Sequence, residues 1–532
     1  MPTLDWIGKD KVINHHKDVP YKVLERKYSF DESGMHKEDI HSNNMIIHGD
    51  NLEALKSLLP QYEGKIKCIY IDPPYNTGNE GWIYNDNVND PKIKKWLGEV
   101  VGKEGEDLSR HDKWLCMMYP RLVLLQKLLA EDGAIFISID DNEHANLLLV
   151  CNEIFGSNNF IQDIIWNKRV SPARDAKFFS TDHEYILVYS KNKESLTTHF
   201  LPRTEKNNSY YKNPDNDPRG PWNSAAYTCN KSRDERPNLY YPITNPYTGE
   251  KIFPKESAVW AYSEETYQQH VRDNLLYWGV NGEAKQPRKK AFLSEVGDVV
   301  PRSVWSHSDV GSTQKATMEN NTIFNMRAFS YPKVSTLVER IIQIASDKDS
   351  IVLDSFAGSG TTAHAVLNMN KSDGGNRKFI LVEMGDYADT ITAERVKRVI
   401  NGYGEGKNAV EGTGGNFSYY ELGNPLFMQD GTINDEVDIT EVRKYVWYTE
   451  TNGIEYKEDI QEKYFLGSYN DTAYYFYYEK DRVTILDYEF LTSVHKKEQT
   501  YVMYADSCAL SDSDLQKWNI TFKKIPRDIE HI

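Results

Sequence analysis

Hydrophobic residues in the first part of the chain form short runs that alternate with helical patterns. Residues 45–49, 67–71 and 134–139 are apolar runs of strand length, and residues 114–130 carry apolar positions at helical spacing. Residues 160–166 and 183–190 add two further strand candidates. Strand, helix and strand in this order predict a parallel sheet with crossover helices.

The pattern changes in the middle of the chain and then returns. From about residue 193 to residue 320 the chain is rich in Asn, Pro, Tyr and Trp and loses the alternation. Beyond it, residues 334–346 predict an amphipathic helix, and residues 350–354 and 378–383 predict strands. A glycine-rich turn and a helical pattern separate these two strands. We therefore predict one sheet that is assembled from both sides of a long insertion.

A third pattern begins near residue 420, where the chain becomes acidic and rich in Tyr. Residues 473–491 predict a β-hairpin, residues 501–505 a strand, residues 511–518 a short helix and residues 520–526 another strand. These elements predict a small, separate α+β module at the end of the chain.

The composition narrows the classes of protein. A chain of 532 residues with 39% hydrophobic residues can form two to four domains. No apolar run approaches about 18 residues, so we expect no membrane span. The first residues lack the apolar stretch of a secretory signal. The five cysteines show no paired spacing, which disfavours a zinc site or disulfides and fits a cytoplasmic protein.

The charge is unevenly distributed. The net charge is −16, but residues 193–319 carry 17 Lys and Arg against 16 Asp and Glu, whereas residues 401–532 carry 13 against 24. The middle segment therefore remains compatible with a nucleic-acid-binding face, because binding depends on local potential. Its clearest basic cluster is residues 285–290, a run that, taken alone, favours a solvated loop over a phosphate contact.

The tetrapeptide Asp72-Pro73-Pro74-Tyr75 directly follows a predicted strand. Ligands of open α/β sheets bind at the carboxyl ends of strands. Two prolines stiffen the backbone there. An Asp carboxylate and a proline carbonyl can accept both hydrogens of an exocyclic amino group, while an aromatic ring stacks on the base. Such a site suits an adenine extruded from a duplex. The alternative is a Pro-Pro turn with a capping Asp.

A glycine-rich turn, DSFAGSGTT, starts at Asp354 and opens a helix. Glycines let the backbone approach a ligand, and a helix N-terminus favours an anionic group. A phosphate-binding P-loop is disfavoured because no Lys precedes Thr361, and Ala363 replaces the third glycine of a dinucleotide fingerprint. Glu383 ends the next strand at the spacing of an acid that binds ribose hydroxyls. An ordinary strand-to-helix turn, with Glu383 as a structural cap, stays open.

In this order, Tyr75 before Phe356 with an insertion between them, the chain resembles the β-group of DNA amino-methyltransferases. In that group a D-P-P-Y motif precedes an F-x-G-x-G cofactor motif, and the target-recognition domain lies between the two. Several segments are similar to modification subunits of type III restriction–modification systems: residues 69–87, 110–125 and 133–143, residues 329–342 and, more weakly, 522–529.

The resemblance implies a Rossmann-like α/β fold that binds S-adenosylmethionine and methylates adenine N6 in DNA after base flipping. The implied catalytic residues are Asp72, Pro73, Pro74 and Tyr75. The implied cofactor-binding residues are Asp50, Lys333, Asp354, Phe356, Ala357, Gly358, Ser359, Gly360, Thr361, Thr362 and Glu383. Lys333 is expected to contact the cofactor carboxylate, and Val334 departs from the Y-P-K-P pattern of the group. No metal is required.

The resemblance also divides the chain into an N-terminal extension (1–40), the catalytic half of the methyltransferase domain (41–192), a target-recognition domain (193–321), the cofactor-binding half (322–420) and the C-terminal α+β module (421–532). The expected partners are double-stranded DNA, a second copy of the chain in a homodimer, and a helicase–nuclease restriction subunit.

Four alternatives stay open. A cytosine-N4 enzyme more often carries Ser at the position of Asp72, and an enzyme acting on RNA or on protein glutamine does not fit the large insertion. A catalytically silent DNA-binding subunit has no reason to retain the cofactor motif. A solitary adenine methyltransferase without a restriction partner shares these motifs.

Overall fold

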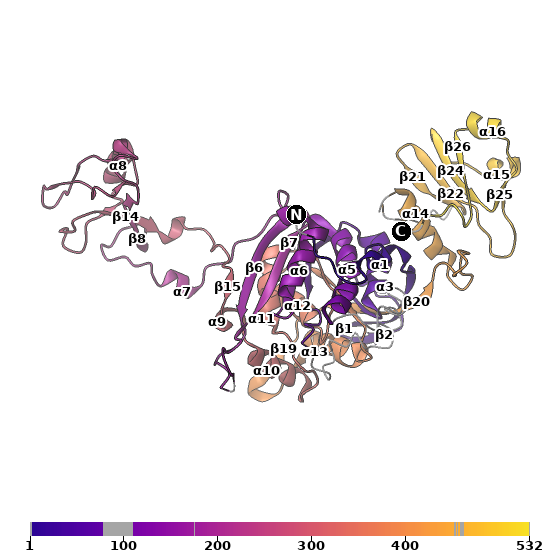
Figure 1. Cartoon of the computed structure of the whole chain (residues 1–532), viewed down its shortest axis with the longest axis horizontal. Helices are drawn as coiled ribbons and strands as arrows, with labels where there is room; N and C mark the ends of the chain where they lie inside the picture. Colours follow the sequence, from indigo (N-terminus) through magenta and orange to yellow (C-terminus); the bar gives the residue numbers. More distant parts are fainter. Residues whose placement is uncertain are drawn as a thin grey trace. The chain divides into compact units, whose positions relative to one another are not determined.

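The computed structural model describes residues 3–77, 110–174, 176–451, 454, 456–457 and 462–530. It divides the chain into two compact units (Figure 1). The larger unit comprises Met1–His199 and Arg302–Ile532, and the smaller comprises Phe200–Pro301. The smaller unit lies within the segment 193–321 for which an insertion is predicted.

The larger unit is built on an eleven-stranded mixed sheet. Its central strands pair in parallel, while the strands at both sides add antiparallel pairs. This arrangement confirms the predicted α/β fold with a mixed, mainly parallel sheet. The strand order is β15 (Val304–Trp305), β6 (Phe160–Asn167), β7 (His183–Ser190), β5 (Leu129–Ile139), β4 (Ile66–Ile71), β16 (Ile351–Asp354), β17 (Lys378–Glu383), β3 (Met45–His48), β20 (Asn416–Pro425), β1 (Lys22–Asp31) and β2 (Gly34–His36).

The central strands are buried, which explains their continuous apolar runs. Every residue of β4 is buried, as are nearly all of β16 and β17. Helices α3 (Asn51–Tyr62) and α5 (Arg110–Leu128) pack on each other, and α11 (Ser335–Ala345) packs on α12 (Thr361–Asp373). The crossovers from β3 through α3 to β4 and from β4 through α5 to β5 move along the sheet in one direction. The crossover from β16 through α12 to β17 moves in the other direction. Because parallel crossovers are right-handed, the two helix pairs cover opposite faces.

Several boundaries differ from the sequence prediction. The helix predicted over 114–130 is α5 and ends at Leu128, because Leu129 already pairs with Ile66 of β4. Residues 78–87 of the motif segment 69–87 lie outside the described residues.

No helix in the described ranges is long and apolar enough to cross a membrane. Other helices and strands of this unit are α1 (Lys9–Val12), α2 (His15–Asp18), α6 (His144–Cys151), α9 (His307–Val310), α10 (Thr313–Phe324), α13 (Glu394–Asn401), β18 (Gly402–Tyr403) and β19 (Val410–Glu411).

The C-terminal residues form their own sheet, and the hairpin predicted within 473–491 is wrong. Strand β22 (Thr472–Phe476) instead pairs antiparallel with the preceding strand, β21 (Phe465–Tyr469). Asn470 and Asp471 both have positive φ, as a two-residue hairpin turn requires. Further elements are α14 (Ile439–Thr451), β23 (Ile485–Leu486), α15 (Tyr488–Thr492), β24 (Thr500–Ala505), β25 (Ser507–Cys508), α16 (Asp512–Lys517) and β26 (Ile520–Lys524). The strand, short helix and strand predicted after residue 500 are confirmed.

The smaller unit has a short antiparallel sheet and an aromatic core around Tyr227 and Trp260. Its basic run 285–290 is only partly available to a ligand, because Lys290 is buried and its Nζ lies 2.8 Å from Asp217. The elements of this unit are α7 (Glu205–Asn208), β8 (Trp222–Ala226), β9 (Thr228–Cys229), β10 (Ile243–Thr244), β11 (Lys251–Ile252), β12 (Val259–Trp260), α8 (Glu264–Arg272), β13 (Leu276–Tyr277) and β14 (Arg288–Phe292).

Candidate active site

Asp72 follows β4 and meets an ammonium group from the far side of the insertion. The Nζ atom of Lys333 lies 2.7 and 2.8 Å from the two carboxylate oxygens of Asp72. The Tyr75 hydroxyl oxygen lies 2.8 Å from Asp72 and 2.8 Å from the Lys333 Nζ. The fold therefore joins the tetrapeptide to a residue 261 positions away.

Glu184 of β7 is a second carboxylate at this place, and it was not predicted from the sequence. It is buried and lies 3.4 Å from the Lys333 Nζ and 2.9 Å from the Nζ of Lys168. The Tyr75 hydroxyl oxygen is 3.1 Å from Glu184, so its single proton can be donated to only one of the two carboxylates at a time. The sequence signal that could have revealed Glu184 was a charged residue near the start of an otherwise mainly apolar strand.

The two carboxylates and two ammonium groups balance one another. Burial raises the pKa of Asp72, while Lys333 opposes this shift. Burial would also raise the pKa of Glu184, but Lys333 and Lys168 together hold it below its usual range. Burial would lower the pKa of Lys333, yet Asp72 and Glu184 keep that pKa above its usual value. Lys333 therefore carries its charge in this cluster.

Two cavities meet at the Asp72–Lys333 pair. One has a volume of about 310 Å³ and is lined by the whole tetrapeptide, Lys168 and Glu184, among others. The other is a narrow cleft between Asp72 and the glycine-rich turn, lined there by Asp354, Phe356, Ala357, Gly358, Ser359 and Thr361. Asp72 and Lys333 line both. A group bound in one cavity can thus reach a group bound in the other beside the Asp72 carboxylate.

The glycine-rich turn is held by neutral donors. Asp354 accepts a hydrogen bond from the Phe356 N–H at 3.0 Å and another from the Thr362 hydroxyl. Burial raises the pKa of Asp354 to about 7. Gly360 has φ +83°, and a Cβ atom there would lie 2.9 Å from the Thr392 carbonyl oxygen. Backbone conformation and close approach both explain glycine at this position.

A buried arginine, which was also not predicted from the sequence, supports the far end of the turn. Arg395 donates to the hydroxyls of Ser359 and Thr361 at 2.9 and 2.8 Å. Its guanidinium also pairs with Glu319 of α10. The Thr361 hydroxyl donates to the Lys333 carbonyl at 3.2 Å. The start of α12 is thereby tied to the segment that carries Lys333.

A family model described as DNA methylase matches residues 66–394, a range that includes both Asp72 and the glycine-rich turn. This chain belongs to the DNA methylase family. Its matched relatives include the StyLTI Mod subunit of a type III restriction-modification enzyme from Salmonella typhimurium, at 34% identity over 74% of this chain and 62% of that protein. The EcoPI Mod subunit from Escherichia phage P1 is 32% identical over 72% of this chain and 63% of that protein.

A relative of another type is the type II methyltransferase M.KpnI from Klebsiella pneumoniae. It is 33% identical over 64% of this chain and 81% of its own length. The chain thus spans less than two thirds of the two Mod subunits but most of M.KpnI.

In this member of the DNA methylase family, four of the predicted cofactor residues lie outside both cavity linings: Asp50, Gly360, Thr362 and Glu383. Glu383 accepts hydrogen bonds from the Gly358 N–H at 2.7 Å and the Gly385 N–H at 2.8 Å. Asp50 caps α3 by accepting from the Leu52 N–H at 2.8 Å. Glu383 is therefore attached to the glycine-rich turn itself, whereas Asp50 is held at the start of a helix.

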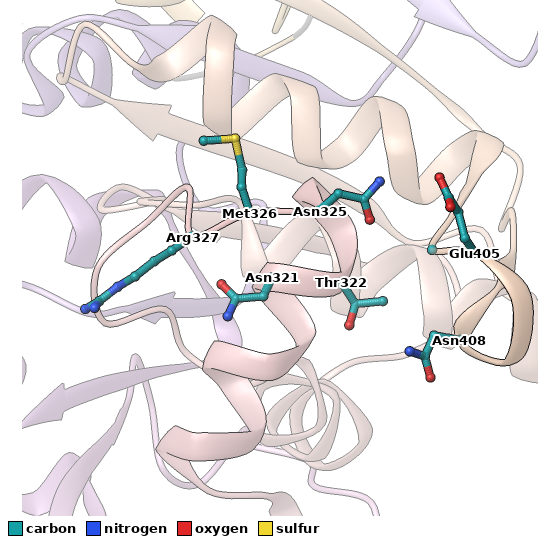
Figure 2. A pocket seen from close by; sticks show the side chains of 8 residues that line it. Asn321, Thr322, Asn325, Met326, Arg327, Glu405 and Asn408 are labelled. Carbon is teal, nitrogen blue, oxygen red and sulfur yellow. The ribbon is translucent and has the colours of Figure 1, made fainter.

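A further hollow, of about 470 Å³, lies between the end of α10 and residues 404–408 (Figure 2). It is lined by Asn321, Thr322, Asn325, Met326, Arg327, Gly404, Glu405 and Asn408. The Arg327 side chain extends away from Glu405 (Figure 2). None of the residues implied by the family resemblance lines this hollow. The described residues include no group of three or more His, Cys, Asp or Glu arranged to hold a metal ion. The Asp72 cavity is therefore the candidate active site.

Proposed function

We propose that this DNA methylase transfers a methyl group from S-adenosylmethionine to N6 of an adenine extruded from double-stranded DNA. The observation that carries the proposal is the meeting of two cavities at Asp72, one lined by Tyr75 and one by the glycine-rich turn. Membership of the DNA methylase family and the similarity to two type III Mod subunits support it.

The cleft beside the glycine-rich turn fits the cofactor. Gly358 and Gly360 have positive φ, so the turn presents backbone without Cβ atoms ahead of the 13-residue helix α12. Phe356 and the backbone of residues 357–359 would hold S-adenosylmethionine, with Glu383 and Asp50 as candidate partners of its ribose and adenine. When bound, it supplies a methyl group on a positively charged sulfur. Lys333 remains a candidate for its carboxylate.

The cavity of about 310 Å³ that is lined by the tetrapeptide suits an extruded adenine. Tyr75 can stack on the base, while Asp72 and the Pro73 carbonyl accept the two N6 hydrogens and expose the nitrogen lone pair. Asp72 is also placed to accept the proton that N6 loses. Lys333 must first leave Asp72, and Glu184, 3.4 Å away, can retain it. Catalysis then rests on positioning and electrostatics, without a covalent enzyme intermediate.

The decisive test replaces Asp72 with Ala in the full chain. We expect methyl transfer to fall at least about a thousandfold, because an electrostatic contact at the reacting group is lost, while the Kd for S-adenosylmethionine stays within about threefold. The matched control is Asp349→Ala, an exposed aspartate ahead of β16, which should behave as wild type. Near-wild-type turnover of Asp72→Ala would contradict the assignment.

The target base is tested separately. Digestion of DNA methylated by the protein, followed by identification of the modified nucleoside, should give N6-methyladenine. Recovery of N4-methylcytosine would instead support the cytosine alternative. Sequencing of modified DNA from cells that express the protein should give the recognition sequence at the same time.

We further propose that the chain is the modification subunit of a type III system, in which a helicase–nuclease partner acts on unmodified DNA. The Mod relatives support this, whereas the similarity to M.KpnI, a type II methyltransferase, keeps a methyltransferase outside a type III system as the second candidate. A restriction subunit encoded in the neighbouring reading frame is the expected result. A homodimer is expected in light scattering, and a monomer would refute that part.

The roles of the other segments complete the proposal. The unit Phe200–Pro301 is compact on its own and lies between the two halves of the methylase domain in sequence, which supports target recognition by residues 193–321. The acidic C-terminal module is the proposed docking or dimerisation surface. Exchange of the insertion with that of a related enzyme should change the recognition sequence and leave the modified base unchanged.

A further inference from the structure

The segment between β6 and β7, residues 168–182, begins and ends at the proposed adenine cavity. The Lys168 N–H donates to the Asp182 carbonyl at 2.9 Å, which closes the base of the segment. Lys168 and Arg169 line the cavity at its start, and Glu184 lines it just beyond its end. The segment continues past the ends of these two strands (Figure 1). Both of its ends are therefore fixed where a base would enter.

Two adjacent phenylalanines of this segment are almost fully exposed. Phe178 is 82% and Phe179 is 93% exposed. A phenylalanine ring buries on the order of 150–250 Å² when it packs, so two neighbouring exposed rings forgo a large hydrophobic stabilisation. Exposed apolar groups of this kind mark interaction surfaces. These two rings are available to a partner.

The charge around the two rings is opposite to that of the whole chain. Residues 168–182 hold four basic and two acidic residues, whereas the chain has a net charge of −16. Arg169, Arg174 and Lys177 are exposed, and the Lys177 Nζ lies 5.2 Å from the centre of the Phe178 ring. Exposed cations beside exposed aromatic rings match the phosphates and the stacked bases of DNA.

We propose that the Phe178–Phe179 pair is a wedge that enters the base stack of the duplex and fills the gap left by the extruded adenine. This inference rests on the proposed function. Extrusion leaves an apolar gap between the flanking base pairs, and apolar side chains inserted between base steps stabilise a distorted duplex. Stacking of a base on an aromatic side chain contributes about 1–3 kcal/mol. Arg169, Arg174 and Lys177 contact the phosphates on either side.

The position of the segment explains why this wedge would act on the base that is methylated. Its ends lie at the cavity lined by Asp72 and Tyr75, so a ring inserted from it would be next to the nucleotide whose base occupies that cavity. The wedge stabilises the extruded state of DNA and does not touch the cofactor cleft, whose lining contains none of the described residues of 168–182. Phe178 and Phe179 are therefore positioning residues.

The test compares the full-length double variant Phe178→Ser/Phe179→Ser with wild type in single-turnover methylation. One substrate is a matched duplex that carries the recognition sequence found by sequencing of modified DNA. The other has a mismatch opposite the target adenine, which lowers the cost of extrusion. We expect at least a tenfold loss on the matched duplex, a loss at least threefold smaller on the mismatched one, and an unchanged Kd for S-adenosylmethionine.

Controls separate the possible failures. Met35→Ser, at an apolar site on β2 that is 61% exposed, should be as active as wild type. The single variants Phe178→Ser and Phe179→Ser repeat the test if the double variant does not keep the wild-type Tm. A loss below tenfold on the matched duplex, or an equal loss on both duplexes, overturns the wedge. A changed oligomeric state in light scattering also overturns it, in favour of a second copy of the chain as the occupant. Wild-type protein that methylates neither duplex contradicts the proposed function instead.

Discussion

Asp72 and Asp354 lie at the carboxyl ends of the neighbouring parallel strands β4 and β16, but their carboxylates have different partners. Both oxygens of Asp72 lie within 2.8 Å of the Lys333 ammonium. Asp354 has neutral hydrogen-bond donors, the Phe356 N–H and the Thr362 hydroxyl. Burial raises the pKa of both, to about 7 for Asp354, whereas Lys333 opposes the shift at Asp72. Among the described residues, the fold thus supplies a counter-ion to Asp72 and none to Asp354.

The two sets of partners also differ in how easily they can be removed. The Phe356 N–H that binds Asp354 is fixed by the backbone of the turn. Lys333 holds Asp72 through a flexible four-carbon side chain, and a second carboxylate, Glu184, lies 3.4 Å from its Nζ. The Asp72 carboxylate can therefore exchange its partner for a substrate amino group, while the Asp354 carboxylate retains its partners and shapes the turn.

Removal of the counter-ion should have the largest effect on this contrast. In Lys333→Met, Asp72 and Glu184 lose the cation that they share, and an unpaired buried charge is strongly unfavourable. We expect the free energy of unfolding to fall by about 3 kcal/mol. We also expect methyl transfer to fall on the order of a hundredfold, a loss of the size expected for an electrostatic contact at the reacting group. Chemical denaturation and a turnover assay measure the two effects.

The control for this variant is Lys371→Met, which removes an exposed ion pair with Glu411. Such pairs contribute about 0–1 kcal/mol, so stability and turnover should stay close to wild type. Equal stability losses in the two variants would show that the buried Lys333–Asp72 pair contributes no more to the free energy of unfolding than the exposed Lys371–Glu411 pair.

The second effect concerns pH and Asp354. Its pKa is raised to about 7 in the folded protein and is about 4 in the unfolded chain. Between these values the unfolded chain has lost the proton that the folded protein keeps, so this group lowers stability as pH rises from about 4 to 7. Asp354→Asn removes that dependence. Relative to wild type, the variant should gain on the order of 2 kcal/mol in stability between pH 5 and pH 8.

Thermal denaturation at both pH values measures this gain, with Asp349→Asn as the exposed control. The contrast with Asp72 predicts a smaller pH-dependent gain for Asp72→Asn, because Lys333 already opposes the pKa shift there. A gain for Asp72→Asn as large as that for Asp354→Asn would break the comparison.

The residues on this edge of the sheet differ in how far the sequence could predict them. Strands β4, β16 and β17 were predictable because central parallel strands are continuous apolar runs. Asp72 and the glycine-rich turn were predictable because each directly follows such a run. The hairpin expected over 473–491 failed because the turn at Asn470 and Asp471 lies before that range.

The ion pairs could not be predicted in the same way. Lys333 was expected at the cofactor carboxylate through the family resemblance, but its Nζ lies on Asp72. Glu184 is 109 residues from Tyr75 in sequence, and the strand pattern does not predict which charged residues will lie next to Glu184. Pairing of charges depends on which strands become neighbours, and here β7 joins the sheet antiparallel, next to β5. Glu184 is therefore the residue that most needs a direct test.

Glu184→Gln gives the smallest expected effect and the sharpest test of the contrast. The amide keeps the size of the side chain and removes a negative charge that raises the pKa of Asp72. Asp72 accepts the N6 hydrogens in its ionised form, so the acidic limb of the pH–rate profile follows its pKa. We expect this limb to move to lower pH and turnover above it to fall by less than about tenfold, because the Gln amide oxygen can still accept a hydrogen bond from Lys333 when it leaves Asp72.

The matched control is Glu411→Gln, a glutamate with 89% side-chain exposure that also pairs with a lysine. Its pH–rate profile should coincide with that of wild type. A limb that stays in place in Glu184→Gln would mean that Asp72 does not sense Glu184, and a limb that moves to higher pH would reverse the assigned sign. A shift to lower pH would instead indicate that Asp72 shares Lys333 with Glu184 during turnover, whereas Asp354 on the next strand has no such partner among the residues that the structure describes.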